Sequence, residues 1–111
     1  MFFANFEGGL VEQPDETIHQ SVRLKLMAAL KALPERERLE FTEARLLTGA
    51  TDGNLGAHIA RLEQAGYIGV EKDFVGKRPR TRLHLTKSGR RAFDKYADFL
   101  RGVLDATDRR S

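Results

Sequence analysis

Two helix-forming stretches follow one another with almost no connection between them, and this feature restricts the folds open to the chain. Residues 42–48 have a helical pattern that ends at Gly49, and a second helical pattern covers residues 51–65. Only Gly49 and Ala50 separate the two patterns. The apolar residues of the second stretch recur at the spacing of a buried helix face: Leu55, Ile59 and Leu62. Two helices joined by so short a turn predict a helix-turn-helix.

A longer helix is expected before this pair. Thr17 and Gln20 have the spacing of a capping box, which predicts a helix that begins at Thr17. Pro34 should end this helix, because proline has no amide hydrogen to continue it. The apolar residues repeat every three or four positions and form one stripe: Ile18, Val22, Leu26, Leu30 and Leu33.

The segment between the longer helix and the helix-turn-helix is expected to contain a very short strand at residues 39–41. Thr42 is the candidate N-cap of the short helix that follows. Phe41 then precedes the cap and is placed to pack against Leu46.

After the helical pattern at residues 51–65, the spacing of apolar residues changes from the helical period to strict alternation with polar residues. Residues 67–75 and 80–86 place apolar side chains at every second position, at Ile68, Val70, Leu83 and Leu85. The connecting residues 76–79 read Gly-Lys-Arg-Pro. This pattern predicts a β-hairpin that projects basic residues on its loop.

A final helix is expected from a cap at Thr86 to about Asp105. Its apolar stripe is wider than a small domain needs for its own core, and consists of Ala92, Phe93, Tyr96, Phe99, Leu100, Val103 and Leu104. We therefore expect part of the stripe to contact a partner. The domain organisation predicted is an N-terminal arm at residues 1–16, one domain at residues 17–105 and a flexible tail at residues 106–111.

Basic charge is concentrated in one part of the chain. Residues 76–91 contain no acidic side chain and seven basic ones: Lys77, Arg78, Arg80, Arg82, Lys87, Arg90 and Arg91. The formal net charge is +3, so the other residues together sum to −4. A basic block in a nearly neutral chain indicates a polyanionic partner.

Several classes of function are disfavoured by what the sequence lacks. With no Cys, the chain has no disulfide, no thiolate nucleophile and no cysteine metal site. His19, His58 and His84 lack the spacing of a metal site, so we expect no metal and no cofactor. No nucleophile with a matched base is visible, which argues against an enzyme. Without an apolar run of membrane-spanning length or a basic N-terminal signal, we expect a cytoplasmic protein.

The order of elements and the local motifs together resemble a known family. The motifs are Thr51-Asp52-Gly53-Asn54-Leu55, Lys77-Arg78-Pro79-Arg80-Thr81 and Leu85-Thr86 followed by Gly89-Arg90. From about Thr17 to Val103 the chain resembles small winged-helix transcriptional regulators related to the MarR and ArsR groups. The resemblance implies an α+β, mostly helical fold: a winged helix-turn-helix with a two- to three-stranded antiparallel sheet and a C-terminal dimerisation helix.

The resemblance also implies a site for double-stranded DNA. The helix at residues 52–65 would enter the major groove, because four of its side chains point away from the apolar face: Asn54, Ala57, His58 and Arg61. Thr51 at the helix start would bind phosphate. The wing side chains Lys77, Arg78 and Arg80 would reach the adjacent groove or backbone.

A homodimer is expected through the last helix, with the interface formed by Phe93, Tyr96, Phe99, Leu100, Val103 and Leu104. The N-terminal residues Phe2, Phe3, Phe6 and Leu10 are candidates for the same interface. The expected function is a sequence-specific DNA-binding transcriptional regulator, with a repressor favoured over an activator. An unidentified small-molecule effector is a candidate further partner. The alternative is a winged helix that serves as a protein-interaction module without specific DNA binding.

Overall fold

The computed structural model describes residues 13–108 and contains four helices and a three-stranded sheet within that range. The elements in chain order are α1 (Ser21–Ala32), β1 (Leu39–Glu40), α2 (Phe41–Thr48), α3 (Asp52–Gln64), β2 (Ile68–Val75), β3 (Arg78–Leu85) and α4 (Lys87–Asp108). The sheet is antiparallel, with strand order β1-β3-β2. This architecture confirms the predicted α+β winged helix-turn-helix.

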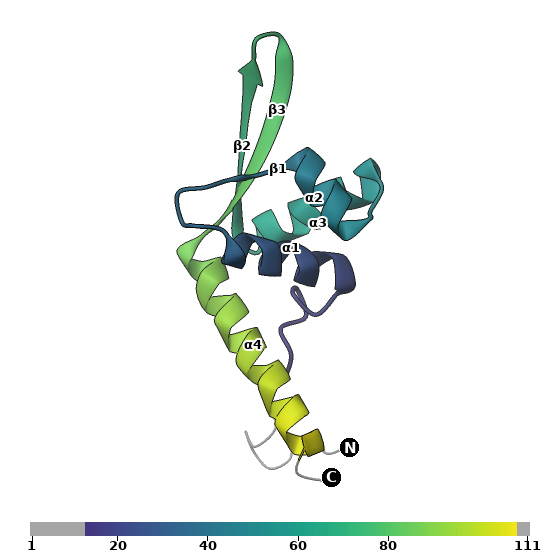
Figure 1. The fold of residues 1–111 in the computed structure, drawn as a ribbon, viewed down its shortest axis with the longest axis vertical. Helices are drawn as coiled ribbons and strands as arrows, with labels where there is room; N and C mark the ends of the chain where they lie inside the picture. Colours follow the sequence, from purple (N-terminus) through teal and green to yellow (C-terminus); the bar gives the residue numbers. More distant parts are fainter. Residues whose placement is uncertain (1–12, 109–111) are drawn as a thin grey trace.

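The molecule is elongated, with extents of 57 × 27 × 26 Å. Helices α1, α2 and α3 form a body beside the base of the sheet, and the β2–β3 hairpin projects from it (Figure 1). Helix α4 runs away from the body in the opposite direction. None of the helices in the described range is both long and apolar enough to cross a membrane.

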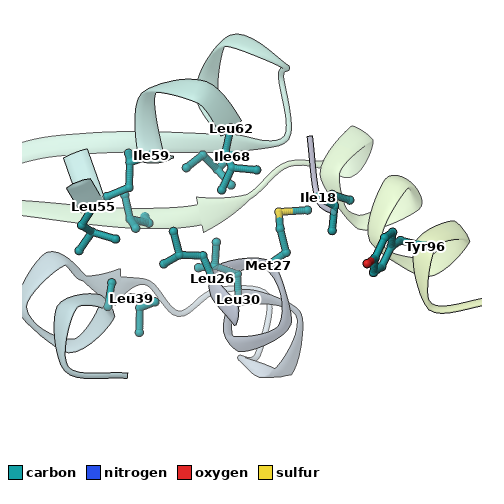
Figure 2. Packing of buried hydrophobic residues seen from close by; sticks show 12 residues of the cluster. Ile18, Leu26, Met27, Leu30, Leu39, Leu55, Ile59, Leu62, Ile68 and Tyr96 are labelled. Atoms are coloured by element: carbon teal, nitrogen blue, oxygen red, sulfur yellow. The ribbon is translucent and has the colours of Figure 1, made fainter. Parts of the chain in front are cut away.

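The core lies where α1 and α3 meet one face of the sheet (Figure 2). Leu26 and Leu30 of α1 and Leu55 and Leu62 of α3 are buried there together with Leu83 of β3. The predicted apolar face of α3 is therefore confirmed, and Leu26 and Leu30 of the stripe predicted for the first helix are buried, while Ile18 and Leu33 of that stripe lie outside α1. A second part of the core joins α4 to the body, where Ile18 lies between Met27 and Tyr96.

Helix α1 begins later than the sequence predicts. Its N-cap is Gln20, whose side chain accepts from the amide of Arg23 at 2.9 Å. The capping box at Thr17 is wrong, because the carboxylate of Asp15 already accepts from the amides of Thr17 and Ile18 at 2.9 and 3.3 Å. Residues 15–18 therefore form a turn ahead of the helix.

Helix α2 also has a different cap. Glu40 and Glu43 form a reciprocal capping box, so α2 starts at Phe41 and the predicted cap at Thr42 is wrong. Because Phe41 is then inside the helix, its side chain packs against the core. Leu46 is 80% exposed, so the expected packing of Phe41 on Leu46 is also wrong.

The hairpin is longer and its turn tighter than predicted. The eight residues of β2 pair with the eight of β3, from Ile68 opposite Leu85 to Val75 opposite Arg78. The turn consists of Gly76 and Lys77, and Gly76 has the positive φ of 63° that two-residue hairpin turns of type II′ require at this position. Strand β1 pairs only with the other end of β3, so β3 is an edge strand at Pro79, where a missing amide is tolerated.

The start of α4 explains the Leu-Thr-x-x-Gly motif. Thr86 is the predicted cap, since its hydroxyl oxygen accepts from the amide of Gly89 at 2.9 Å and its proton goes to the carbonyl of Gly66 at 2.6 Å. The amide of Thr86 donates to the carbonyl of Tyr67 at 3.0 Å. Gly89 lies against the same carbonyl, and a Cβ at this position would be 2.0 Å from its oxygen. The helix continues to Asp108, so residues 106–108 of the expected flexible tail are helical.

Candidate nucleic-acid interface

Helix α3 presents a face of small residues to solvent. Because Leu55, Ile59 and Leu62 are buried, the opposite side of the helix is exposed at Gly53, Asn54, Ala57, Ala60, Arg61 and Gln64. Asn54, Ala57 and Arg61 are therefore where the sequence predicts them. Gly53, Ala60 and Gln64 share this face and were missed, although the helical period alone contains the signal. A face centred on glycine and alanine allows the helix backbone to come close to a partner.

The N-terminus of α3 is fixed by its cap and by an ion pair. The hydroxyl of Thr51 accepts from the amide of Asn54 at 3.2 Å, which leaves the hydroxyl proton available to a phosphate. Arg45 of α2 lies 3.1 Å from the carboxylate of Asp52, and this pair joins the two helices of the helix-turn-helix.

On one flank of α3, the side chain of His58 meets an arginine side chain from α1. His58 is partly buried there, and Nη1 of Arg23 lies 2.9 Å from its Nδ1. Burial, and secondarily the guanidinium of Arg23, lower the pKa of His58. Burial and the nearby charge of Arg61 lower the pKa of Arg23. Arg23 was missed because nothing in its local sequence shows that α1 brings it to α3.

The wing differs most from the sequence prediction in the surroundings of Arg80. This residue lies on β3 and already has an acid partner on β2, because its guanidinium donates to both carboxylate oxygens of Asp73 at 2.9 and 2.7 Å. The hydrogen bond from Arg80 lowers the pKa of Asp73 and raises the pKa of Arg80 itself. Arg78 and Lys77 are exposed at the end of the hairpin. Within residues 13–108, no carboxylate lies within 4.0 Å of either.

The same face of the hairpin continues as a ladder of opposite charges. Arg38, ahead of β1, donates to Glu71 at 2.8 Å, and this hydrogen bond is the main reason that the pKa of Glu71 is lowered. Arg82 lies 3.5 Å from both Glu71 and Asp73. Two of the seven basic residues in the acid-free segment are therefore matched by acids on the neighbouring strand.

The opposite face of the hairpin borders a hollow beside α3. A groove of about 520 Å³ separates Ala60 and Glu63 of α3 from Lys72 and Thr81 of the hairpin. Beyond it, Phe74 is 69% exposed near the end of β2. Helix α3 and the middle of the hairpin thus lie on either side of this groove.

Helix α4 places the six predicted interface residues in different surroundings. Val103 and Leu104 are 50% and 63% exposed on the part of the helix that extends beyond the body. Phe93, Phe99 and Leu100 are half-buried against the core of their own chain. Tyr96 is only 3% exposed, and its hydroxyl shares a hydrogen bond of 2.7 Å with Nδ1 of His19. The candidates Phe2, Phe3, Phe6 and Leu10 lie outside the described residues.

Comparison with known families identifies the domain. A family model described as a winged helix DNA-binding domain matches residues 22–104. The chain belongs to this family. The predicted resemblance to winged-helix regulators is therefore confirmed, and the family consists of DNA-binding domains rather than enzymes.

A relative and two solved structures are similar to the chain. An uncharacterized protein of Methanocaldococcus jannaschii is 36% identical over 75 residues, which cover 68% of this chain and 78% of the relative. The structure of a transcriptional regulator homologue from Pyrococcus horikoshii has a TM-score of 0.73 and 29% identity, covering 84% of this chain and 89% of the other. A putative transcriptional regulator from Salmonella typhimurium shares the fold, with a TM-score of 0.63, 21% identity and coverage of 84% and 86%.

Proposed function

We propose that this winged-helix protein is a sequence-specific transcriptional regulator that binds double-stranded DNA as a homodimer. Helix α3 enters the major groove, and the wing contacts the adjacent groove or backbone. The observation that carries this proposal is the distribution of unmatched cations around α3. Arg61 lies on one flank, Lys77 and Arg78 lie at the end of the wing, and small side chains lie between them.

The outer face of α3, with its glycine and alanine residues, supports direct contact with base edges. Asn54 and Arg61 have the donors and acceptors that recognise adenine and guanine, and Ala57 fits a thymine methyl group. Thr51 and Arg78 are suited to phosphates, which set the register of a protein on DNA. Arg80 contributes to DNA binding mainly by stiffening the wing, because Asp73 already matches its charge.

The exposed end of α4 supports the homodimer. Val103 and Leu104 are apolar, adjacent and uncovered, and a second copy of α4 would bury them. Phe93, Phe99 and Leu100 would form the edge of this contact, while Tyr96 supports the helix from inside the domain. Leu104→Asp should convert a dimer to a monomer in sedimentation at equal protein concentration. Leu46→Asp on α2 is the control, since Leu46 is equally apolar and 80% exposed.

A repressor role and a small-molecule effector are part of the same proposal. Beside α4, a cavity of about 150 Å³ is lined by Asp15, Lys95, Tyr96 and Phe99, among others. Ligand sites usually measure about 300–1,000 Å³, so a second protomer would have to enlarge this cavity before it held an effector. The expected cytoplasmic location follows from access to DNA.

The deciding experiment is fluorescence anisotropy of the full chain with its own upstream DNA and with a scrambled duplex of equal length. Tighter binding to the native sequence, with an affinity that falls steeply with salt, supports the proposal. Equal and weak binding to both duplexes rejects it. In that case the protein-interaction alternative takes its place, with the exposed Phe74 at the wing as the first candidate for the partner surface.

A further inference from the structure

Three nitrogen-bearing side chains meet on the flank of α3 that faces α1. Arg23 of α1 is held at two points, because its Nε donates to the carbonyl of Thr17 and its Nη1 contacts Nδ1 of His58 at 2.9 Å. Arg61 follows His58 by one turn of α3 and is exposed beside it. The guanidinium of Arg23 is therefore a fixed group at the edge of the proposed DNA-binding face.

The contact between Arg23 and His58 determines where the imidazole carries its proton. A guanidinium only donates hydrogen bonds, so Nδ1 of His58 must accept. Burial and the Arg23 charge lower the pKa of His58, which favours the neutral ring that an accepting Nδ1 requires. A neutral ring that accepts at Nδ1 carries its single proton on Nε2.

The Nε2 nitrogen of His58 is free to contact a partner. It has no hydrogen-bond partner among residues 13–108. It is also not one of the buried side-chain atoms that lack a partner in this range, which are Nε of Arg82 and Nδ1 of His84. The Nε2–H group therefore reaches solvent, on the side of α3 that also carries Asn54 and Arg61.

The positive charges beside His58 have no anionic partner among the described residues. Arg61 is close enough to Arg23 to lower its pKa, and no carboxylate of the described residues lies within 4.0 Å of either guanidinium. Arg45 and Arg80, in contrast, each have a carboxylate partner. Two neighbouring cations without an acid repel each other, and a phosphate group would relieve this repulsion.

We propose that Arg23 is a positioning residue for DNA recognition. It holds His58 as the Nε2–H tautomer, so that this nitrogen donates to an acceptor on the DNA, while the guanidinium of Arg23 neutralises an adjacent phosphate. The acceptor is a guanine edge or a phosphate oxygen, both of which accept from an N–H donor. This inference rests on the proposed function, since it assigns a role within the same interface.

The first test compares two amide substitutions at His58 in the full-length protein. Glutamine places its amide near the position of Nε2, and asparagine places its amide near Nδ1. His58→Gln should bind the upstream duplex within about threefold of the wild type, whereas His58→Asn should weaken binding about tenfold, the effect of one lost hydrogen bond. Equal affinities for the wild type and His58→Asn would overturn the role of Nε2.

The second test reads the tautomer directly. The chain has three histidines, so 15N NMR of the free protein can assign the protonated nitrogen of each ring. His58 should show the Nε2–H form in the wild type and in Arg23→Lys, and a mixture of tautomers in Arg23→Met. Arg23→Met should also lose affinity for DNA, and Arg23→Lys should recover it. An unchanged tautomer and unchanged affinity in Arg23→Met would refute the inference.

The two levels of the proposal fail in different ways. If the wild type binds no DNA, the proposed function fails and the recognition role of Arg23 fails with it, although the NMR result still reports the hydrogen bond. If the wild type binds DNA and the Arg23 and His58 variants bind equally well, only this inference fails. If the variants lose affinity as expected, replacing guanine by 7-deazaguanine at single positions separates the two acceptors, because the replacement removes the N7 acceptor of one base and leaves every phosphate in place.

Discussion

Gly89 gives the sharpest test of how α4 is joined to the winged helix. Its missing side chain is required by packing, because a Cβ would lie 2.0 Å from the carbonyl oxygen of Tyr67 and 2.8 Å from the carbonyl carbon. These are backbone atoms and cannot rotate away. Gly102 lies on the same helix, and a Cβ added there would have no neighbouring atom within 4 Å, so this position provides a matched control.

The expected effects of alanine at the two positions have opposite signs. In a helix, Gly→Ala stabilises by up to about 1 kcal/mol, and this gain should appear in Gly102→Ala. In Gly89→Ala the gain is outweighed by the steric overlap, for which overpacked interiors typically lose about 1–3 kcal/mol or more. The displaced carbonyl also accepts from the amide of Thr86, so the first turn of α4 would shift with it.

The assay is urea unfolding followed by circular dichroism at one fixed protein concentration, since a dimer makes apparent stability concentration-dependent. The two variants should differ in free energy of unfolding by about 1–3 kcal/mol or more, because the helix gain is common to both and only the overlap at Gly89 remains in the difference. If Gly89→Ala is as stable as Gly102→Ala, the close approach of α4 to Tyr67 is wrong.

Three further predictions concern the cap, the wing and the N-terminal turn. Thr86→Val should lower the free energy of unfolding by about 1 kcal/mol in the same urea assay, because it removes the cap of α4. Arg78→Ala should reduce the slope of log affinity against log salt concentration by about 0.9 per protomer. Arg80→Ala should reduce this slope by less, because a carboxylate already matches the charge of Arg80. Equal slopes for the two variants would contradict this prediction. The hydrogen bond to Asp15 raises the pKa of Tyr67 to about 12, so wild-type stability should fall as the pH rises from about 10, where the unfolded tyrosine ionises, to about 12. Asp15→Asn should shrink that fall, as measured by phenolate absorbance and urea unfolding.

The sequence predicted the elements whose signals are local. The spacing of Leu55, Ile59 and Leu62 was sufficient to find α3 and its buried face, and Thr86 was recognised as a cap from position alone. Each of these signals depends on residues within one or two helical turns. Local periodicity was therefore enough to find the candidate recognition helix and most of its exposed face.

Competing caps could not be resolved in the same way. Thr17 has the right neighbours for a capping box, but its amide donates to Asp15 and not to the side chain of Gln20, as such a box would require. Thr42 is a good N-cap residue, yet Glu40 and Glu43 satisfy each other's backbone amides and move the start of α2. In both places two local hydrogen-bonding solutions compete, and residue type at the cap position does not decide between them.

The contacts missed at the candidate site are those made between distant segments. Arg23 reaches His58 across 35 positions of the chain, which no local pattern reveals. The partners of Arg80 and Arg82 could have been found, because a two-residue turn at Gly76 and Lys77 fixes the register of the whole hairpin. That register places Asp73 opposite Arg80.

The cross-strand ion pairs show that the basic residues of the hairpin have two different roles. A two-stranded hairpin is only marginally stable by itself, and opposite charges facing each other across strands contribute about 0.2–1 kcal/mol each. The pairs that Arg82 forms with Glu71 and Arg80 forms with Asp73 therefore stabilise the hairpin at the last position paired with β1 and just beyond it. The cations of the described hairpin that have no carboxylate within 4.0 Å are Lys72 on β2 and, at the end of the hairpin, Lys77 and Arg78. Arg80 and Arg82 thus stabilise the hairpin, and Lys77 and Arg78 provide unpaired positive charge at its end. Only Lys77 and Arg78 are expected to contribute to the salt dependence of DNA binding as phosphate-binding residues do.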